Sequence, residues 1–437
     1  MKYFFIIFIK FIMKNKFILS TIILITGGAI TKILGMIIKI VTTRLIGIKG
    51  IGMYMLILPT FSHLISLSQA GIPLALSKLI SEDKRNNKKL FFSNLPIIII
   101  INLLLMIIIL LFAPFISAKL LHHKSLSISI KAIAFVIPFT TISNICRSYF
   151  FGKQKMFPHV FSNIIEDLLR LLIIIIFLPM INSIKYQVLF LILINIISEV
   201  VSTVILVFFL PKDITITKDD LKVNRNYIKD SLKISIPNTT SKLIGSIAYF
   251  LEPIILMFFL SRNYSKDYIV LEYGILNGYV LPLILLPSFF SLAISQALLP
   301  VISKEYTNNN IKSSKKKLKL AVALSFIIGS ISTTVLMFRG EILLKFIYHT
   351  KEGITYLKIL SPVFLLQYIQ APLISSLDAI NLSKINLYAN IISTLIRTIC
   401  LIILSTFKIG IYSLIISIYL NIIITTIYLI IKVKENI

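Results

Sequence analysis

The sequence predicts an all-α polytopic membrane protein with about twelve transmembrane helices. Of its 437 residues, 57% are hydrophobic, and the mean hydropathy of the chain is +0.94. Apolar runs of about 18 or more residues, long enough to cross a bilayer as helices, fill almost the whole chain. These runs leave no room for a sizeable soluble domain.

The predicted spans follow one another with short connections. Their approximate limits are 17–40, 53–78, 91–117, 128–150, 158–181, 186–210, 228–260, 270–300, 319–344, 354–380, 384–407 and 410–431. The third, PIIIIINLLLMIIILLFAPF, has the clearest apolar pattern. The seventh and eighth are longer than a simple crossing needs, so we expect them to tilt or bend.

The distribution of basic residues predicts that both termini are cytoplasmic. With the N-terminus inside, the cytoplasmic segments hold 26 Lys and Arg residues and the opposite side holds 13. Arg147 is counted on the cytoplasmic side, in the turn that ends at Lys155. Membrane topology therefore explains much of the formal charge of +28, which does not indicate a nucleic-acid partner.

Catalytic and metal-binding patterns are missing from the sequence. The two cysteines, Cys146 and Cys400, lie in or beside apolar runs and predict neither a disulfide framework nor a metal site. There is no phosphate-binding P-loop and no HExxH, and the loops are too short for a catalytic domain. We expect a protein that is not an enzyme and has no cofactor.

The sequence also predicts two lobes of six helices each. A polar segment at 211–226, expected to be a cytoplasmic linker, separates an N-terminal lobe (1–210) from a C-terminal lobe (227–437). An even number of helices gives both lobes the same orientation in the membrane. Repeats of this kind are typical of alternating-access transporters, whose substrate site lies between the repeats near mid-depth.

Short matches between the two halves support the repeat. TKILG (Thr31–Gly35) matches SKLIG (Ser241–Gly245), which lies 210 residues later. NIIEDLLR (163–170) matches NIISTLIR (390–397), which lies 227 residues later. Each match places a basic residue inside a hydrophobic run in both halves.

Charged side chains inside membrane spans are costly and are therefore candidate functional residues. The basic ones are Lys32, Lys39, Lys78, Arg170, Lys242 and Arg397, and the acidic ones are Glu166, Asp167, Glu199, Glu252 and Asp378. Lys32 and Lys242 occupy matched repeat positions, which favours an anion site for a phosphate or pyrophosphate. The alternative is that they extend to the headgroups or pair with a neighbouring acid.

The repeated arginine has different neighbours in the two halves. Arg170 follows Glu166 by four residues, a spacing that predicts an ion pair on one helix face and competes with a role in substrate binding. Arg397 has no acid at that position and needs another partner. That partner is an anionic substrate, Asp378 or Glu199.

Several charged residues are open to two interpretations, ion coupling or an internal ion pair. They are Glu252, Glu166, Arg170 and Asp378. Glu252 stands beside a proline, so it is either a proton- or cation-coupling carboxylate or a residue at a helix kink. In the second case its partner is expected to be Lys32 or Arg44.

Three blocks of the sequence resemble one known family. They are RLIGIKGIGMYMLILPTFSHLISLSQAGIPLALSKLISE (44–82), RSYFFGKQKMFPHVFSNIIEDLLRLL (147–172) and LPSFFSLAISQALLPVISKE (286–305). The first carries a turn at Gly50, Gly52 and Tyr54, and the second carries the patterns Arg-x-Tyr-Phe-x-Gly, Met-x-Pro and Glu-x-x-x-Arg. These blocks resemble the stage V sporulation protein B and polysaccharide-biosynthesis group of the multidrug/oligosaccharidyl-lipid/polysaccharide exporter superfamily.

The resemblance implies a MATE-like fold and a flippase in the bacterial cell membrane. Such a protein moves an undecaprenyl-pyrophosphate-linked cell-wall precursor, lipid II or a related glycan, from the inner to the outer leaflet by alternating access. The implied partners are the lipid-linked glycan, the bilayer, H⁺ or Na⁺, and cell-wall synthesis proteins. The implied biology is peptidoglycan or polysaccharide biosynthesis, with a link to sporulation.

The resemblance also implies roles for particular residues. In related lipid II flippases, basic residues of the central cavity engage the pyrophosphate, and Lys32 and Arg44 best fit that role here. Lys242 joins them as the repeat counterpart of Lys32, and Arg397 is a weaker candidate. Many members have fourteen helices, so a chain of about twelve leaves open how the lipid tail is guided and widens the substrates to other polyprenyl glycans.

Three other functions remain open from the sequence. A cation-coupled multidrug exporter of the same fold would need acids in its cavity, yet basic residues in the spans match or outnumber acidic ones. A non-transporting scaffold for cell-wall synthesis is the second. An integral-membrane transferase is the third, although no loop offers a cluster of catalytic acids or histidines.

Overall fold

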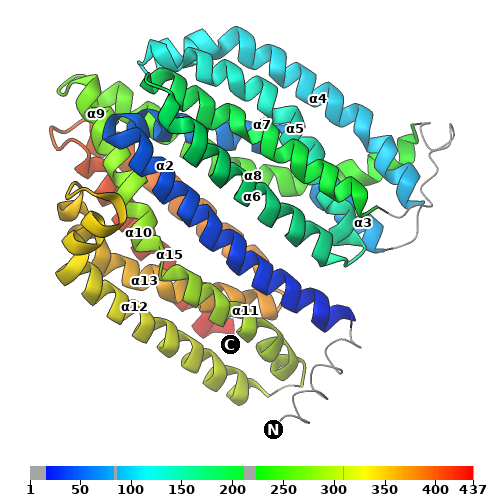
Figure 1. Ribbon diagram of the computed structural model, residues 1–437. Coiled ribbons are helices and arrows are strands. Elements are labelled where there is room, and N and C mark those ends of the chain that lie inside the picture. Colours follow the sequence, from blue (N-terminus) through cyan, green and yellow to red (C-terminus); the bar gives the residue numbers. More distant parts are fainter. Residues whose placement is uncertain (1–15, 83–85, 211–222, 309, 437) are drawn as a thin grey trace. The chain divides into compact units, whose positions relative to one another are not determined.

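The computed structural model describes residues 16–82, 86–210, 223–308 and 310–436. Within these ranges the ordered elements are helices and no strand occurs, which confirms the all-α class (Figure 1). Nine helices of this part of the chain are long and apolar enough to cross a membrane. The count of twelve spans and the cytoplasmic position of the termini stay predictions, and most of the predicted linker, residues 211–222, lies outside the described residues.

The helices follow one another along the chain in two groups. The first group is α2 (Lys16–Gln69), α3 (Ile72–Ser81), α4 (Asn87–Phe115), the π-helix η1 (Ile116–Leu120), the short η2 (Lys124–Leu126), α5 (Ser127–Gly152), α6 (Met156–Phe177), η3 (Leu178–Met180), α7 (Ile184–Phe208) and α8 (Arg225–Leu260). The second group is α9 (Lys266–Gly274), the π-helix η4 (Ile275–Val280), α10 (Leu281–Leu285), α11 (Ser288–Thr307), α12 (Ile311–Tyr348), α13 (Ile354–Ala379), α14 (Ser383–Ser405) and α15 (Tyr412–Asn436).

Local sequence explains where several of these helices begin. Asn86 caps α4, because its side-chain oxygen accepts hydrogen bonds from the backbone of Lys88 and Lys89 at 3.0 and 3.2 Å. Ser265 caps α9 in the same way. Gly353, with φ of 85°, precedes α13 and supplies a conformation that other residues rarely adopt.

The described chain forms two compact units. The first holds the residues up to Leu45, Thr60–Lys119 and His123–Leu243, and the second holds Ile46–Pro59, Leu120–His122 and the residues from Ile244 onward. Helices α2 and α8 therefore each contribute to both units. The lobe boundaries expected at residues 210 and 227 remain a prediction.

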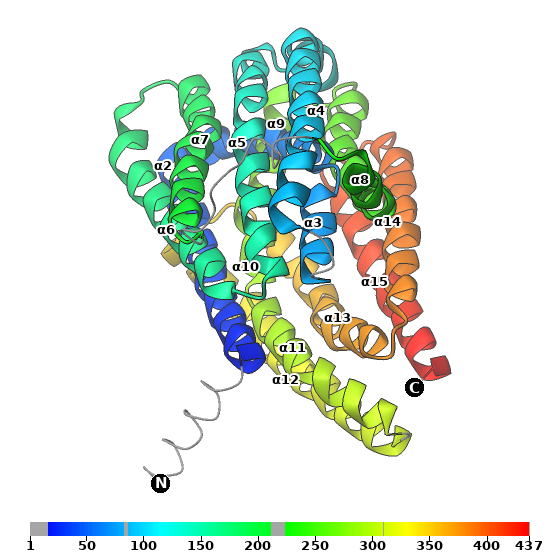
Figure 2. The same cartoon turned by 90° about the vertical axis from the view of Figure 1, so that its right-hand side faces the viewer.

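The same pattern of helix packing occurs in each unit. In the first, α5 packs on α3, α4, α6 and α7, and α6 packs on α7. In the second, α13 packs on α11, α12, α14 and α15, and α14 packs on α15 (Figure 2). The two central helices also carry internal prolines, Pro138 and Pro362, 224 residues apart. The repeat suggested by the short sequence matches thus has a counterpart in packing.

The turn between the first two predicted spans lies elsewhere than expected. The resemblance placed it at Gly50, Gly52 and Tyr54, but these residues are helical. The non-helical residue of α2 is Gly47, whose φ of 65° and ψ of −178° suit glycine and few other residues. One residue, and not a loop, therefore redirects this helix.

Gly52 has a packing role in place of the expected turn. Within the second unit, a Cβ added at Gly52 would lie 2.3 Å from the carbonyl oxygen of Val270. A Cβ added at Gly274 would lie 2.5 Å from the Cα of Gly52. The two backbones touch at this crossing of α2 and α9, as is common for small residues between membrane helices.

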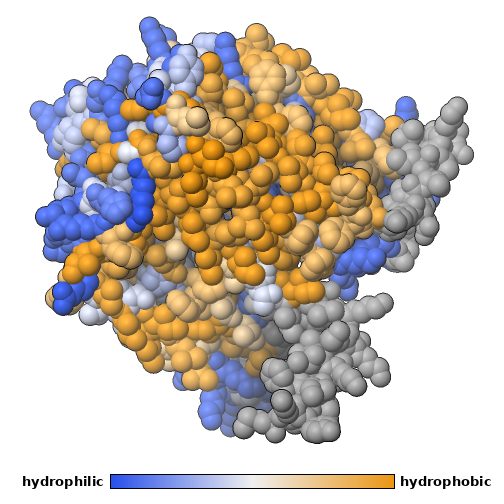
Figure 3. Space-filling view, viewed as in Figure 1, coloured by the Kyte–Doolittle hydropathy of each residue, from blue (hydrophilic) through white to orange (hydrophobic). Residues whose placement is uncertain are grey.

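The faces of α4 are arranged for a lipid environment. Asn94 and Asn102 are buried, and the Asn102 oxygen accepts a hydrogen bond from Thr141 of α5 at 3.2 Å. Large apolar side chains on the opposite face, including Leu104 and Leu111, are more than half exposed. Figure 3 shows apolar side chains across the middle of the visible surface. Polar groups inside and apolar groups outside are what a helix in hydrocarbon requires.

We predict that Gly52→Ala destabilises the protein by about 1–3 kcal/mol, because the added methyl group would force two backbones apart. Gly28→Ala is the matched control in the same helix, since a Cβ there would meet no described atom within 4 Å. Thermal unfolding of the purified protein in detergent measures both. Equal melting temperatures for the two variants would contradict the packing at this crossing.

Candidate functional site

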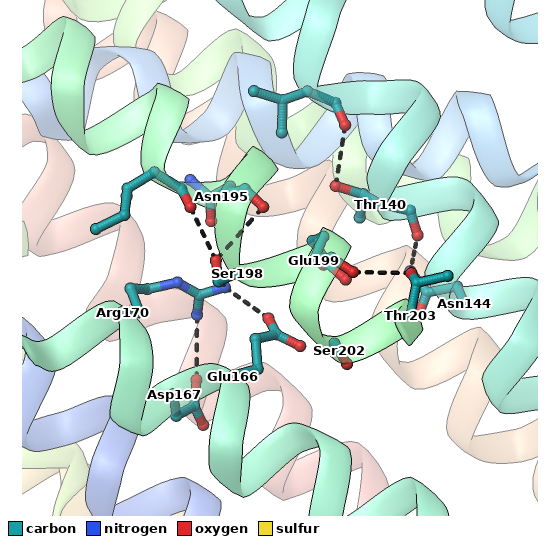
Figure 4. Close-up of polar contacts among 12 residues, drawn as sticks. Thr140, Asn144, Glu166, Asp167, Arg170, Asn195, Ser198, Glu199, Ser202 and Thr203 are labelled. Carbon is teal, nitrogen blue, oxygen red and sulfur yellow. Dashed lines mark hydrogen bonds and ion pairs between the residues drawn. The ribbon is translucent and has the colours of Figure 1, made fainter. Parts of the chain in front are cut away.

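A buried ion cluster joins α5, α6 and α7 within the first unit. Figure 4 shows Glu166, Asp167 and Arg170 of α6 beside Ser198 and Glu199 of α7. Glu166 lies at the centre of the cluster and is bound by two arginines. Its Oε1 accepts a hydrogen bond from Arg170 at 2.6 Å, which forms the pair expected from their spacing, and its Oε2 accepts one from Arg147 of α5. One carboxylate thus ties two helices together.

Two further acids complete the cluster. Arg147 Nη2 lies 3.2 Å from Glu199 Oε2 of α7 and donates to Ser202 Oγ at 2.8 Å. Arg170 Nη1 lies 3.1 Å from Asp167 Oδ1. The Arg147, Glu166 and Glu199 side chains are only 12%, 8% and 9% exposed. In such a low-dielectric place an unpaired charge is very costly, so these groups depend on one another.

The role of Arg147 differs from the one expected from sequence. Counting basic residues assigned it to a cytoplasmic turn, but its side chain is buried in the ion cluster near the end of α5. Its placement in a turn was wrong, because a count of loop charges cannot separate a residue inside a helix end from one in the adjacent loop. The cytoplasmic side stays a prediction. The sequence signal that could have placed Arg147 in the ion cluster is the Arg-x-Tyr-Phe-x-Gly pattern, which lies close to the Glu-x-x-x-Arg pattern of α6.

The second unit holds the repeated arginine in a different way. Arg397 of α14 forms an ion pair with Glu252 of α8, and Glu252 also accepts a hydrogen bond from Tyr273 at 3.1 Å. The Glu252 side chain is 4% exposed, whereas that of Arg397 is 28% exposed. Neither the partners expected for Glu252 nor those expected for Arg397 included this pairing. Both copies of the repeated arginine nevertheless bind a buried glutamate.

Asp378 forms no ion pair with any residue that the structure describes. It is half-buried near the end of α13, and its Oδ1 accepts a hydrogen bond from Asn386 at 2.8 Å. No group of three or more His, Cys, Asp or Glu residues in the described ranges is arranged to hold a metal ion. Ion coupling through Asp378 stays a prediction.

The candidate diphosphate-binding residues lie in both units. Lys32, Arg44 and Lys242 belong to the first unit and Arg397 to the second. Lys32, Arg44 and Lys242 are exposed. Among described residues, Lys32 and Lys242 have no ion-pair partner, which sets them apart from the buried arginines.

The helix face that carries Lys32 has exposed backbone on both sides of the lysine. Gly28 and Gly35 lie four residues before and three residues after Lys32, so all three share one face of α2. A Cβ at either glycine would meet no described atom within 4 Å. Gly245, three residues after Lys242, has the same property. A ligand that reached either lysine would therefore also find bare backbone.

Comparison with known proteins identifies the family. The sequence profile of the family described as polysaccharide biosynthesis protein matches residues 18–306. The chain belongs to this family. The MatE profile also matches, over residues 243–404. The resemblance noted in three blocks of the sequence is thereby confirmed.

Two curated relatives are similar over most of the chain. Stage V sporulation protein B of Bacillus subtilis (strain 168) is 30% identical over 408 residues, which cover 90% of this chain and 78% of that protein. Sporulation protein YkvU of the same strain is 24% identical over 392 residues, which cover 87% of this chain and 86% of that protein.

Solved structures with the same fold are transporters. An inward-facing multidrug resistance MATE family transporter of the MOP superfamily has a TM-score of 0.73 at 16% identity, covering 93% of this chain and 94% of its own. A MOP superfamily transporter from Pyrococcus furiosus has a TM-score of 0.61 at 15% identity. The match covers 96% of this chain and 95% of that protein's chain. The MATE-like fold is confirmed. The protein is a multi-pass membrane protein of a bacterial cell membrane.

We predict that Arg397→Gln destabilises the protein by about 3–5 kcal/mol, because Glu252 would keep a buried charge without its cation. The double variant Glu252→Gln, Arg397→Gln should recover most of this loss. Thermal unfolding in detergent of the native chain, the two single variants and the double variant measures the coupling between the two side chains.

The pair Lys317–Glu305 is the matched control, since its side chains are 39% and 20% exposed and lie 2.5 Å apart. Glu305→Gln should change the melting temperature little, because solvent screens such pairs. Additive effects of the two substitutions at 252 and 397 would contradict a direct ion pair.

Proposed function

We propose that this protein is a flippase for an undecaprenyl-pyrophosphate-linked cell-wall precursor, lipid II or a related glycan. It carries the polar headgroup from the inner to the outer leaflet by alternating access, while the polyprenyl tail stays in lipid. The observation that carries the proposal is the pair of exposed lysines at matched repeat positions, Lys32 and Lys242, without a described acidic partner.

The physical argument rests on the cost of a lysine within a membrane helix. An unpaired ammonium in the bilayer interior costs several kcal/mol, unless an anion or water accompanies it. A diphosphate supplies that anion and accepts charge-assisted hydrogen bonds from each ammonium. Glycines beside both lysines leave room for the phosphate oxygens to approach the helix backbone. Arg44 is the third cation in this assignment.

Arg397 is a weaker member of the same set. Its guanidinium already binds Glu252, and its side chain is 28% exposed. Binding a diphosphate would require it to exchange Glu252 for phosphate or to hold both. An arginine can bridge two anions, since it has five N–H donors.

The buried acids argue against a cationic substrate. Glu166, Glu199 and Glu252 each bind an arginine. A cationic drug would have to displace those guanidiniums to reach a carboxylate. The likeness to a multidrug transporter, at 16% identity, shows the fold alone. That two curated relatives are sporulation proteins supports a substrate of cell-wall assembly.

We predict that this chain restores outer-leaflet lipid II in a bacterium depleted of its own lipid II flippase, and that Lys32→Ala, Lys242→Ala does not. The measured quantity is the fraction of lipid II reached by an enzyme that acts only at the outer face. Lys32→Arg, Lys242→Arg should retain most activity, because the positive charge is kept.

The matched control is Lys315→Ala, Lys316→Ala, which removes two exposed lysines from the start of α12. It should behave like the native chain. If the native chain inserts stably and restores nothing, lipid II is the wrong substrate. If cells need the chain yet both alanine variants support growth equally, the two lysines do not bind substrate, and a scaffold role gains support.

A further inference from the structure

Four tyrosines gather at one end of the second unit, where three of its helices begin. Tyr268 lies in the first turn of α9, Tyr356 lies in the first turn of α13, and Tyr412 is the first residue of α15. Tyr264, just before α9, stacks on Tyr268 at a centroid distance of 5.0 Å and donates to the backbone oxygen of Lys408 at 2.8 Å. Tyr356 and Tyr412 meet edge to face at 5.6 Å. We call these four residues the tyrosine cluster.

One carboxylate, Glu272 of α9, belongs to the tyrosine cluster through a hydrogen bond. Its Oε2 accepts from the Tyr356 hydroxyl at 2.5 Å, which ties α9 to α13. Glu272 is half-buried and lies in an apolar segment long enough to cross a membrane, Lys266–Leu285. It forms no ion pair with any residue that the structure describes, unlike the buried glutamates above, each of which binds an arginine. A charged side chain in such a segment is a candidate functional residue.

Three polar atoms lie close together here without a hydrogen-bond partner among the described residues. They are Glu272 Oε1 and the hydroxyl oxygens of Tyr268 and Tyr412. Tyr268 is near enough to Glu272 and Tyr412 to interact electrostatically, yet it exchanges no hydrogen bond with either. Its hydroxyl lies against Gly410, where an added Cβ would be 3.1 Å from that oxygen. All three atoms can therefore still bind a ligand.

Aromatic rings beside a carboxylate suit a sugar. A tyrosine has an apolar face and a polar tip, and a pyranose ring likewise has a face of C–H groups and a rim of hydroxyls. Sugar hydroxyls donate to a carboxylate and accept from phenol hydroxyls. The Tyr412 side chain is 37% exposed, so a ligand can reach its ring from outside the protein.

A belt of aromatic residues at the membrane surface is the simpler explanation of exposed tyrosines. Such a belt consists of rings that lie separately among the lipid headgroups, and it does not require an acid. Here the rings of three helices meet around Glu272, which keeps one oxygen without a donor. Partial burial of a carboxylate is costly unless donors compensate it, and a ligand rich in hydroxyls supplies them.

An organic ammonium group is the other ligand that aromatic rings and a carboxylate can hold. Two features favour the sugar. The stacked rings of Tyr264 and Tyr268 cover one face of each other, whereas a cation needs open ring faces around it. The hydroxyls of Tyr268 and Tyr412 can donate to sugar oxygens, but an ammonium group has no acceptor for them.

We propose that Glu272, Tyr268 and Tyr412 form a binding site for one sugar unit of the carried glycan. Glu272 Oε1 accepts from a sugar hydroxyl, the two phenol hydroxyls donate to neighbouring sugar oxygens, and the Tyr412 ring packs on the apolar face of the sugar. Under the predicted topology this end of the unit lies outside, so the site holds the headgroup after it has crossed. The natural ligand rests on the proposed function, whereas sugar binding itself does not.

Saturation-transfer NMR of the full chain in lipid nanodiscs with soluble sugars tests the proposal. The probes are the methyl glycosides of glucose, galactose, mannose and N-acetylglucosamine, which carry neither a lipid nor a diphosphate. We expect at least one of them to bind. Glu272→Gln should weaken that binding by about tenfold, and it should fold because the amide oxygen still accepts from Tyr356. Tyr412→Leu should weaken it by about threefold or more, because the sugar loses its aromatic surface.

Asp267→Asn is the matched control, since Asp267 lies on the same helix but pairs with Lys49 at 3.6 Å and is 66% exposed. It should leave sugar binding unchanged. No binding of any probe, or unchanged binding in both Glu272→Gln and Tyr412→Leu, would overturn the proposal. Binding of choline without binding of a sugar would make this an ammonium site instead.

The same variants separate this proposal from the flippase proposal. Sugar binding that requires Glu272, in a chain that does not restore outer-leaflet lipid II, would keep the sugar site and reject lipid II as the substrate. Restored lipid II without sugar binding would reject the sugar site alone.

Discussion

The structure depends on one constraint, which is that helices surrounded by lipid must neutralise their charges within the protein. The repeated arginine meets it in both units, through Glu166 for Arg170 and through Glu252 for Arg397. In the first unit the arginine and its acid share a helix, and Arg147 ties that pair to α5 and α7. In the second unit the acid comes from another helix, so the ion pair itself joins α8 to α14.

Sequence reasoning succeeded where the determining interaction is local. The all-α class follows from apolar runs, and the pair Glu166–Arg170 follows from a four-residue spacing. It failed where tertiary contact decides. Glu252 and Arg397 are 145 residues apart, and nothing in either neighbourhood identifies the other.

Two glycines of α2 show the same limit of prediction from sequence. Gly47 and Gly52 have similar sequence surroundings, yet Gly47 turns the chain and Gly52 allows two helices to touch. Only the position of α9 distinguishes these roles, and that position depends on the fold of the second unit.

Lys32 and Lys242 differ from every buried arginine described above, since no described acid compensates their charge. Charged residues within membrane helices are candidate functional residues, and we propose an anionic lipid-linked glycan as the ligand of these two lysines.

The most direct test of this account is the equilibrium binding of undecaprenyl diphosphate and undecaprenyl monophosphate to the purified protein. If the two lysines hold the diphosphate, the native chain should prefer it by about tenfold or more, equivalent to about 1.4 kcal/mol. Lys32→Ala, Lys242→Ala should lose that preference while it still binds the polyprenyl tail weakly. Equal affinities of the native chain for the two lipids, or an unchanged preference in the double variant, would contradict the assignment of these lysines.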